Sequence, residues 1–452
     1  MEIHSRSESG LADSTRYLSH RILTKAEKSD RYIDRVLQYE LSHSKIEPAA
    51  KHWITELVMG VTRWQLQVDF LIGRAFHGNF RKAQPELKTL LRMSVYQLRF
   101  MKTPSYAAVN EAVELSKQVN LGKASGLVNA VLRKTVDVDL AKALDEAKFK
   151  GTKRLSVEFS HPEWLLNRWL REHDEATVRE RCHYNNTIPS NWLRYNPLRV
   201  ERQSWESFLT ENESEWTTDP RFPDFYKVKN FGALFQSTGF SGGWFTVQDA
   251  AAGLAPRLLA PKPGDLVLDL CAAPGGKSTY LAELANGQAT VRAYDSAAVR
   301  LEQMRLNFQR LDIPNLSVFQ ADVTTADLPE ADKILLDVPC SGSGVLNRRV
   351  DLRWRRTPND IQDLVDIQAK MLENGWRALK PGGVLVYSTC SLEPEENWHQ
   401  IEAFMIKQSS AVIERPNDQK LAEFVDERGA LMTIPERDHV DGMFVVKLRK
   451  PL

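Results

Sequence analysis

The sequence predicts a multidomain protein with an all-α N-terminal domain, a small α+β middle domain and a C-terminal α/β domain of Rossmann-like design. Three observations predict this order. Apolar residues recur at helical spacing through the first third, the middle is irregular, and the last part alternates short apolar runs with helical stretches. A chain of 452 residues also exceeds what one core usually holds. We expect domains at 1–140, 141–240 and 241–452.

The composition is typical of soluble globular proteins, with 42% hydrophobic and 26% charged residues. No apolar run is long enough for a membrane helix, and the first residues lack the apolar core of a signal peptide. We therefore expect a cytoplasmic protein with no membrane partner. The four cysteines are too scattered for a disulfide framework or a zinc site, so we expect free thiols and no metal.

The net charge of +1 conceals an uneven distribution. Residues 1–150 carry 24 basic and 17 acidic side chains, and the remainder carries 36 and 42. A basic front end on a slightly acidic body is typical of a nucleic-acid-binding module joined to a catalytic one. A solvated helical surface would give the same numbers, so charge alone leaves both interpretations open.

The first third, from about Ser19 to Lys134, has helical spacing throughout and predicts five to seven helices. Three phrases are more distinctive: Glu56-Leu-Val-Met-Gly-Val-Thr-Arg-Trp64, Leu91-Arg-Met-Ser-Val-Tyr-Gln-Leu98, and Ala107-Ala-Val-Asn-Glu-Ala-Val-Glu-Leu-Ser-Lys117 followed by Gly126-Leu-Val-Asn-Ala-Val-Leu-Arg133. Together they resemble the NusB-like helical domain, which implies RNA binding. Candidates for phosphate contacts, each of which also suits an ordinary surface position, are Arg63, Arg92, Arg99, Arg133 and Lys134.

The middle segment, residues 141–240, predicts a charged linker or surface helix, a short helix entered at Pro162, and then a loop and strand around Trp192. The pattern favours a small α+β unit packed on the following domain, which we expect to be an RNA-binding module. It specifies little more.

The C-terminal domain begins with a strand, a glycine turn and a helix. Leu266–Leu270 is a short apolar run, the pair Gly275-Gly276 permits a tight turn, and Ser278–Ala285 has a helical pattern. The glycine spacing fits neither the dinucleotide fingerprint nor the phosphate loop of NTPases. Further strands are predicted at 290–295, 316–322, 333–340, 383–390 and 441–447.

Four of these strands end at or near a carboxylate. We expect the side chains to lie on the ligand-binding edge of the sheet: Asp269, Asp295, Asp322 and Asp337. A row of carboxylates suits a cationic cofactor with a ribose and would repel a pyrophosphate. This chemistry indicates S-adenosylmethionine.

Two cysteines mark the ends of adjacent predicted strands, Cys340 in Asp337-Val-Pro-Cys340 and Cys390 in Ser388-Thr-Cys390. Methylation of carbon C5 of a pyrimidine needs a thiolate, because C5 is a poor nucleophile until a thiolate adds to C6. An ordinary cysteine, with a pKa of about 8.5, is mostly protonated at neutral pH, so local activation is needed. The alternative is that both are small buried apolar residues.

Three motifs resemble the Sun/nucleolar-protein family of RNA cytosine-C5 methyltransferases: Asp269-Leu-Cys-Ala-Ala-Pro-Gly-Gly-Lys277, Leu336-Asp-Val-Pro-Cys-Ser-Gly-Ser-Gly344 and Tyr387-Ser-Thr-Cys-Ser-Leu-Glu-Pro-Glu-Glu-Asn397. With the helical front domain, nearly the whole chain is similar to bacterial Sun-type enzymes. The resemblance implies a class I methyltransferase fold and methylation of 16S ribosomal RNA, at cytosine 967.

The family motifs also imply roles for single residues. Cys390 is implied as the nucleophile on C6, Cys340 as the thiol that assists product release, and Asp337 as the contact to the cytosine N3/N4 edge. The S-adenosylmethionine site is implied to comprise Cys271, Ala272, Ala273, Pro274, Gly275, Gly276, Lys277, Asp295, Asp322 and Asp337. We expect Cys271 to contribute packing and backbone only.

An arginine-rich stretch follows the Pro-Cys motif directly. Five arginines and a tryptophan in nine residues predict contacts to RNA phosphates and to an unstacked base, made by Arg348, Arg349, Arg353, Trp354, Arg355 and Arg356. A solvated loop is the alternative. We expect 16S ribosomal RNA as the partner and a monomer. The same chemistry on another ribosomal or transfer RNA, and an inactive RNA-binding assembly factor, stay open.

Overall fold

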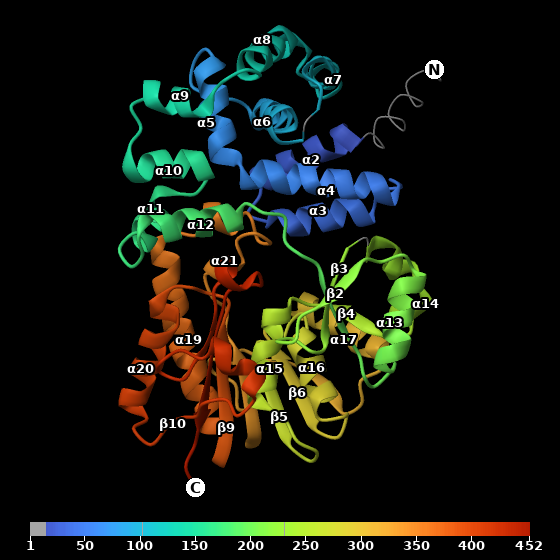
Figure 1. Cartoon of the computed structure of the whole chain (residues 1–452), viewed down its shortest axis with the longest axis vertical. Coiled ribbons are helices and arrows are strands. Elements are labelled where there is room, and N and C mark those ends of the chain that lie inside the picture. The colour runs from blue at the N-terminus through green and yellow to red at the C-terminus, as the bar shows by residue number, and fades with distance from the viewer. Residues whose placement is uncertain (1–14, 102, 230) are drawn as a thin grey trace. The chain divides into compact units, whose positions relative to one another are not determined.

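The computed structural model describes residues 15–101, 103–229 and 231–452 and divides into two compact units (Figure 1). The first, here called the helical unit, comprises the described chain to Thr187 together with Leu346–Arg355. The second, the sheet unit, comprises Ile188–Val345 and Arg356–Leu452. The domain boundaries near 140 and 240 stay predictions.

The helical unit is all-α in its described residues. Seven α-helices lie between Thr15 and Thr135, as the spacing predicts: α2 (Thr15–Glu27), α3 (Ile33–Ser42), α4 (Pro48–Arg63), α5 (Gln65–Ala75), α6 (Pro85–Phe100), α7 (Ser105–Gln118) and α8 (Ser125–Thr135). Four further helices continue it: α9 (Leu140–Glu146), α10 (Gly151–Phe159), α11 (Glu163–Trp169) and α12 (Glu175–Asn185). Prolines open α4 and α6, where a missing N–H is harmless. Apolar faces from α2 to α8 form one core.

A segment distant in sequence completes this unit. Leu346–Arg355, here called the inserted segment, ends in the short helix α18 (Leu352–Arg355), and Val350 is buried in the helical core. Asp351 accepts a hydrogen bond from the backbone N–H of Ile33 at 2.8 Å, at the start of α3. Because these contacts bury both apolar and polar groups, the inserted segment is an integral part of the helical unit.

The sheet unit contains two sheets. The small sheet has the order β2-β3-β1-β4 and is antiparallel. Its strands are β1 (Trp192–Tyr195), β2 (Trp216–Thr218), β3 (Phe225–Val228) and β4 (Phe245–Val247). Helix α13 (Arg202–Glu211) packs Trp205 against Tyr226 and Phe245, and the short helix α14 (Thr238–Ser241) precedes β4. This is the α+β unit that the sequence predicts in the middle segment.

The large sheet has the order β10-β12-β9-β8-β5-β6-β7, with β11 (Leu431–Thr433) pairing on β12. Four parallel pairs join β5 (Leu266–Leu270), β6 (Thr290–Asp295), β7 (Leu316–Gln320), β8 (Ala331–Asp337) and β9 (Leu379–Thr389). Strand β12 (Met443–Arg449) is antiparallel to β9 and to β10 (Val412–Ile413). The predicted strands are thus present, although the third ends two residues before Asp322.

Helices cover both faces of the large sheet (Figure 1). Along each strand the side chains alternate, so Leu268 faces the core formed with α19 (Pro358–Ala378) and α20 (Trp398–Lys407). Val267 faces the core formed with α15 (Leu254–Leu259) and α16 (Gly276–Leu284). Burial on both faces explains why these strands read as continuous apolar runs. Within the described part of the chain, no helix is long and apolar enough to cross a membrane.

Candidate active site

The order of the large sheet places a crevice at the end of β5. The next strand in sequence, β6, lies on one side of β5, and β8 lies on the other. In open α/β sheets ligands bind outside the carboxyl ends of the strands at this reversal. The segment Cys271–Lys277, here called the cofactor turn, leaves β5 at this point and enters α16.

The cofactor turn contains backbone conformations with positive φ, and the glycine in its sequence permits the tightest of them. Gly275 has a φ of 98°, and a Cβ there would lie 2.5 Å from the Phe308 ring. Any larger residue would therefore be strained in its backbone and would clash with α17 (Ala298–Leu311). Cys271 has a φ of 78°, and its thiol contacts the sulfur of Met371 at 3.7 Å. Burial raises the pKa of Cys271, so this thiol stays protonated and serves packing.

Asp269 does not present its carboxylate to the crevice, contrary to our expectation. It is 0% exposed and accepts a hydrogen bond from the Ser278 hydroxyl at 2.5 Å, while its other oxygen has no partner. Burial raises the pKa of Asp269 to about 7, and the hydrogen bond from Ser278 offsets only part of this effect. The side chain lies on the face of the sheet that α16 covers, where it holds Ser278 in the first turn of this helix.

The carboxylates after the next two strands do lie at the ligand edge. Asp295 accepts from the N–H groups of Ala273 (3.2 Å) and Ala297 (3.0 Å), which ties it to the cofactor turn, and it pairs with Arg300 at 2.9 Å. Asp322 accepts from Thr324, and these hydrogen bonds lower its pKa. Two carboxylates beside a glycine turn fit a cationic, ribose-bearing cofactor, with the Asp322 carboxylate reachable from solvent.

Asp337, at the end of β8, is held by two donors. Lys277 Nζ lies 2.7 Å from one carboxylate oxygen, and the Ser388 hydroxyl donates to the other at 2.7 Å. Burial lowers the pKa of Lys277, but the Asp337 carboxylate outweighs it, and the pKa is raised overall. The link from the cofactor turn to Asp337 was not foreseen, because no local pattern joins residues on separate strands.

The structure brings Cys340 and Cys390 together. Their sulfurs lie 3.2 Å apart, and the backbone N–H of Cys390 points to the Cys340 sulfur at 3.3 Å. Both side chains are partly exposed. The hydrogen bond with Cys390 and then burial raise the pKa of Cys340 well above its usual value. Cys340 therefore stays protonated, and its contact with Cys390, here called the thiol pair, is the central feature of the site.

A buried carboxylate supports the loops that carry the thiol pair. Glu396 is 0% exposed and accepts from the Ser341 N–H at 2.8 Å, from the Gln368 amide at 3.0 Å, and from the hydroxyls of Ser341 and Ser391. Sequence reasoning missed this role, although Glu396 lies in the motif Ser391-Leu-Glu-Pro-Glu-Glu-Asn397. The available signal was a carboxylate two residues before the helix α20 (Trp398–Lys407), but two further glutamates in the same polar stretch gave no way to single it out.

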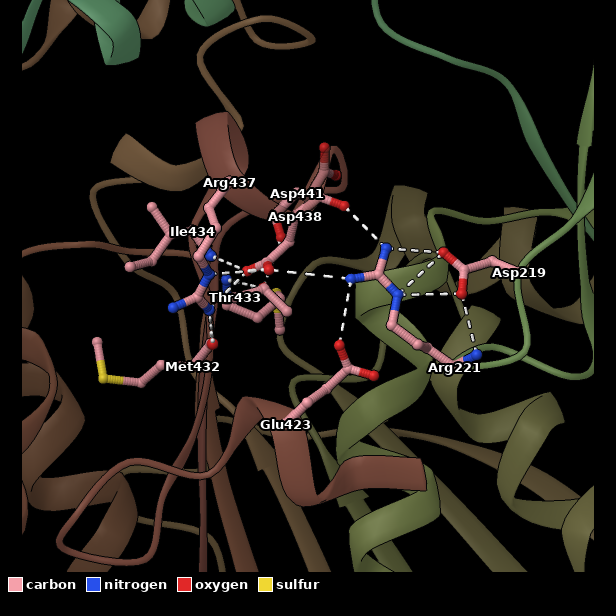
Figure 2. Close-up of polar contacts among 10 residues, drawn as sticks. Asp219, Arg221, Glu423, Met432, Thr433, Ile434, Arg437, Asp438 and Asp441 are labelled. Carbon is pink, nitrogen blue, oxygen red and sulfur yellow. Dashed lines mark hydrogen bonds and ion pairs between the residues drawn. The ribbon is translucent and has the colours of Figure 1, made fainter. Parts of the chain in front are cut away.

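A backbone chain extends the support. The Gly344 N–H donates to the Cys390 carbonyl at 3.0 Å, and the Gly344 carbonyl accepts from Gly442 at 2.8 Å. Figure 2 shows how the segment before Gly442 is held: Arg221 pairs with Asp219, Glu423 and Asp438 at 2.7, 3.7 and 3.9 Å.

The arginine-rich stretch differs most from expectation. The Arg353 side chain is buried and donates to the carbonyls of Ser160 (3.2 Å), Asn185 (2.9 Å) and Leu346 (3.2 Å) and to the side chain of Asn186 (2.8 Å). In this conformation the Arg353 guanidinium is buried and is not accessible to an RNA phosphate. Backbone carbonyls take the place of the anionic partner that the charge density indicated.

Its neighbours are also engaged within the protein. Trp354 donates to the Thr62 carbonyl at 2.7 Å, and Arg355 contacts the Ser29 carbonyl at 3.4 Å. Arg349 pairs with Asp34 at 3.4 Å at a partly exposed position. Arg356 donates to the carbonyls of Cys340 (3.3 Å) and Ser341 (3.4 Å), so it contacts the loop that carries Cys340.

The candidate phosphate contacts in the helical unit differ in their exposure to solvent. Arg63 is buried and donates to the Asn347 carbonyl at 3.0 Å, and Arg92 is buried against Asp69 and Glu27. Arg99 donates to the Val136 carbonyl at 3.1 Å. The two that remain exposed are Arg133 and Lys134.

Family models match three parts of the chain. Residues 256–449 match "16S rRNA methyltransferase RsmB/F", residues 13–137 match the NusB family, and residues 161–232 match a "Methyltr_RsmF/B-like, ferredoxin-like domain". Each of the three matches falls in one of the predicted regions: the helical front, the α+β middle and the methyltransferase domain.

Named relatives match over nearly the whole chain. A "Probable ribosomal RNA small subunit methyltransferase B" from Synechocystis is 35% identical over 97% of this chain and 99% of its own. A "Ribosomal RNA small subunit methyltransferase B" from Cronobacter sakazakii is 35% identical over 92% and 96%. A solved methyltransferase homologue from Pyrococcus horikoshii is 30% identical with a TM-score of 0.58, covering 65% of this chain and 97% of its own.

Proposed function

We propose, from the premise that this chain belongs to the 16S rRNA methyltransferase RsmB/F family of S-adenosylmethionine-dependent enzymes, that it methylates carbon C5 of a cytosine in 16S ribosomal RNA. The observation that carries the proposal is the thiol pair beside Asp337. Transfer to an exocyclic amine needs no thiol, whereas C5 needs a thiolate on C6. The target position, cytosine 967, and a cytoplasmic monomer belong to the same proposal.

The proposed reaction assigns one task to each side chain. The Cys390 thiolate adds to C6 of the cytosine, which moves electron density to C5. Asp337 holds the N3/N4 edge and supports protonation at N3, which offsets the negative charge that the thiolate brings to the ring. S-adenosylmethionine supplies the methyl group that C5 accepts. C5 then loses its proton to solvent, the electrons left on C5 restore the C5–C6 double bond, and the C6–sulfur bond breaks to release Cys390 from the base.

Lys277 and Cys340 complete this assignment. The Lys277 ammonium is held 2.7 Å from Asp337 and is close enough to Cys390 that a Cys390 charge raises the Lys277 pKa. A cation at this place stabilises a thiolate. The protonated Cys340 thiol, 3.2 Å from Cys390, is placed to give a proton to the departing thiolate. This supports a role for Cys340 in product release.

The proposed binding residues follow from position. The cofactor turn (Cys271, Ala272, Ala273, Pro274, Gly275, Gly276, Lys277) with Asp295, Asp322 and Asp337 would hold S-adenosylmethionine. For RNA, the proposal keeps Arg348, Arg349, Arg133 and Lys134, and gives Arg356 the added task of holding the Cys340 loop. Arg353 and Trp354 are assigned to the fold of the helical unit.

Two cysteine variants test the chemistry. Cys390→Ala should abolish methyl transfer to a 16S fragment and form no covalent RNA adduct. Cys340→Ala should accumulate an adduct that survives denaturing gel electrophoresis, because release is impaired. Cys182→Ala, a buried thiol of α12, is the matched control and should behave as the unsubstituted protein. Full turnover by Cys390→Ala would refute the assignment.

The target is tested separately, by mapping 5-methylcytosine in RNA from cells that lack the protein. Loss of the mark from one 16S cytosine supports the proposal. Loss from a transfer RNA or another ribosomal site would move the same chemistry to that substrate.

A further inference from the structure

The first strand of the small sheet carries two buried polar side chains that the proposed reaction does not use. Arg194 lies within β1, and Asn196 follows its last residue. They are 0% and 1% exposed. Buried polar groups of this kind are costly unless they are fully hydrogen-bonded, so their partners indicate what the strand is for.

Arg194 is bonded to the helix that begins at the cofactor turn. Its guanidinium donates to both carboxylate oxygens of Glu283 at 2.8 Å, to the Thr279 hydroxyl at 2.8 Å and to the Gly276 carbonyl at 2.7 Å. These three acceptors belong to α16. The remaining donor contacts the amide oxygen of Gln248, and the amide nitrogen of the same side chain lies 3.4 Å from where a Cβ of Gly276 would be.

Asn196 holds the following helix in the same way. Its amide donates to the carbonyl of Leu311, the last residue of α17, at 3.2 Å and to the Gly243 carbonyl at 3.0 Å. One short segment of the small sheet therefore bonds both helices that flank β6, the strand that ends in Asp295.

The electrostatics of the Arg194–Glu283 pair indicate that it positions α16 rather than stabilises the fold. A cation near the N-terminus of a helix opposes the helix dipole, and a buried ion pair is weak evidence for stability. Burial raises the pKa of Glu283 to about 7, although Arg194 offsets part of that effect. An apolar pair would fill this space with less desolvation. What the charged pair adds is a fixed geometry, since a guanidinium directs its donors in one plane.

We propose that Arg194 is a positioning residue for the cofactor turn: by holding the Gly276 carbonyl it fixes the turn that binds S-adenosylmethionine. Lys277 follows Gly276 directly, so the same contact fixes the lysine that reaches Asp337. The small sheet therefore positions the cofactor site, in addition to making any contact with RNA. This inference rests on the family's cofactor and is independent of the target base and of the roles of the cysteines.

Three variants separate position from stability. Arg194→Met leaves Glu283 as an unpaired buried carboxylate, so both the melting temperature and cofactor affinity should fall. Arg194→Met/Glu283→Met removes the unpaired charge, so the melting temperature should recover. The Gly276 carbonyl still lacks its guanidinium donor, and the Kd of S-adenosylmethionine, measured by calorimetric titration, should stay at least about tenfold weaker.

Arg310→Met is the matched control. Arg310, on α17, also bonds the region of the small sheet, because it donates to the carbonyls of Phe240 in α14 and Phe245 in β4. Among the described residues, these acceptors lie outside the cofactor turn. The Kd of this variant should stay within about twofold of the unsubstituted protein. Arg194→Lys keeps the charge without the planar donors, and its Kd for S-adenosylmethionine should fall between those of the unsubstituted protein and Arg194→Met.

Recovery of wild-type cofactor affinity in the double variant would overturn the proposal, as would an equal loss in Arg310→Met. Absence of binding by the unsubstituted protein would instead refute the cofactor, which keeps the two failures distinct.

Discussion

The inserted segment permits a quantitative test of the assignment of Arg353 to the fold. We consider Arg353→Met, which keeps most of the side-chain volume and removes the guanidinium. In the structure this group makes four hydrogen bonds, three of them to backbone carbonyls. None of the four acceptors is a carboxylate, so the substitution strands no buried negative charge.

The magnitude follows from the two short bonds, to Asn186 at 2.8 Å and Asn185 at 2.9 Å. A hydrogen bond from a charged donor contributes about 1.5–3 kcal/mol, so losing both removes about 3–6 kcal/mol. The methionine recovers part of this by burying an apolar side chain. We expect a loss of about 3 kcal/mol in the free energy of unfolding of the helical unit, which lowers its melting temperature by about 6–12 °C.

Differential scanning calorimetry of the full chain measures this shift. The control is Arg35→Met, because Arg35 is exposed on α3 in the same unit, and it should change the melting temperature by less than about 2 °C. If Arg353→Met shifts the transition no more than Arg35→Met does, the buried contacts do not stabilise the unit, and an RNA role for Arg353 would have to be reconsidered.

Three further variants test the sheet unit. Lys277→Met removes the cation beside Asp337 and should slow single-turnover methyl transfer at least about tenfold; an unchanged rate would contradict the proposed electrostatics. Glu396→Gln replaces a carboxylate that accepts four hydrogen bonds and should cost about 2–4 kcal/mol, seen as a lower urea midpoint at constant m-value. The raised pKa of Asp269 means that the folded state holds a proton that the unfolded state has lost between pH 4 and 7. Stability from this group is complete below pH 4 and is lost as the pH rises through 7, by about 1.4 kcal/mol per unit, so Asp269→Asn should flatten the urea midpoint across that range; an unaltered slope would contradict it.

Local patterns explain which parts of the fold were predictable. The strand at 266–270 is found where the short apolar run indicated, because a strand buried on both faces is mostly apolar. The thiol pair was predictable in part, since both cysteines follow neighbouring strands. Asp269 was placed at the ligand edge because it lies near the end of the apolar run, but β5 continues to Leu270, and the Asp269 side chain is buried on the face that α16 covers.

Long-range polar contacts explain what was not predictable. The density of arginines at 348–356 indicated an anionic ligand, yet Arg353 finds its acceptors at Ser160 and Asn185, far earlier in the chain. Arg194 likewise reaches Gly276 and Glu283, which lie 82 and 89 residues later in the chain. Such partners leave no local periodicity, because a carbonyl acceptor can belong to any residue type.

The inserted segment also bears on how the polypeptide is made. Translation delivers the chain to Thr187 first, then residues 188–345, and only then Leu346–Arg355. Until that last stretch leaves the ribosome, the carbonyls of Ser160 and Asn185 lack their donor, and the core lacks Val350. The front of the protein therefore completes its folding after the Pro-Cys loop has been synthesised. A gene cut after codon 187 would lack Leu346–Arg355 and would therefore not yield the complete helical unit.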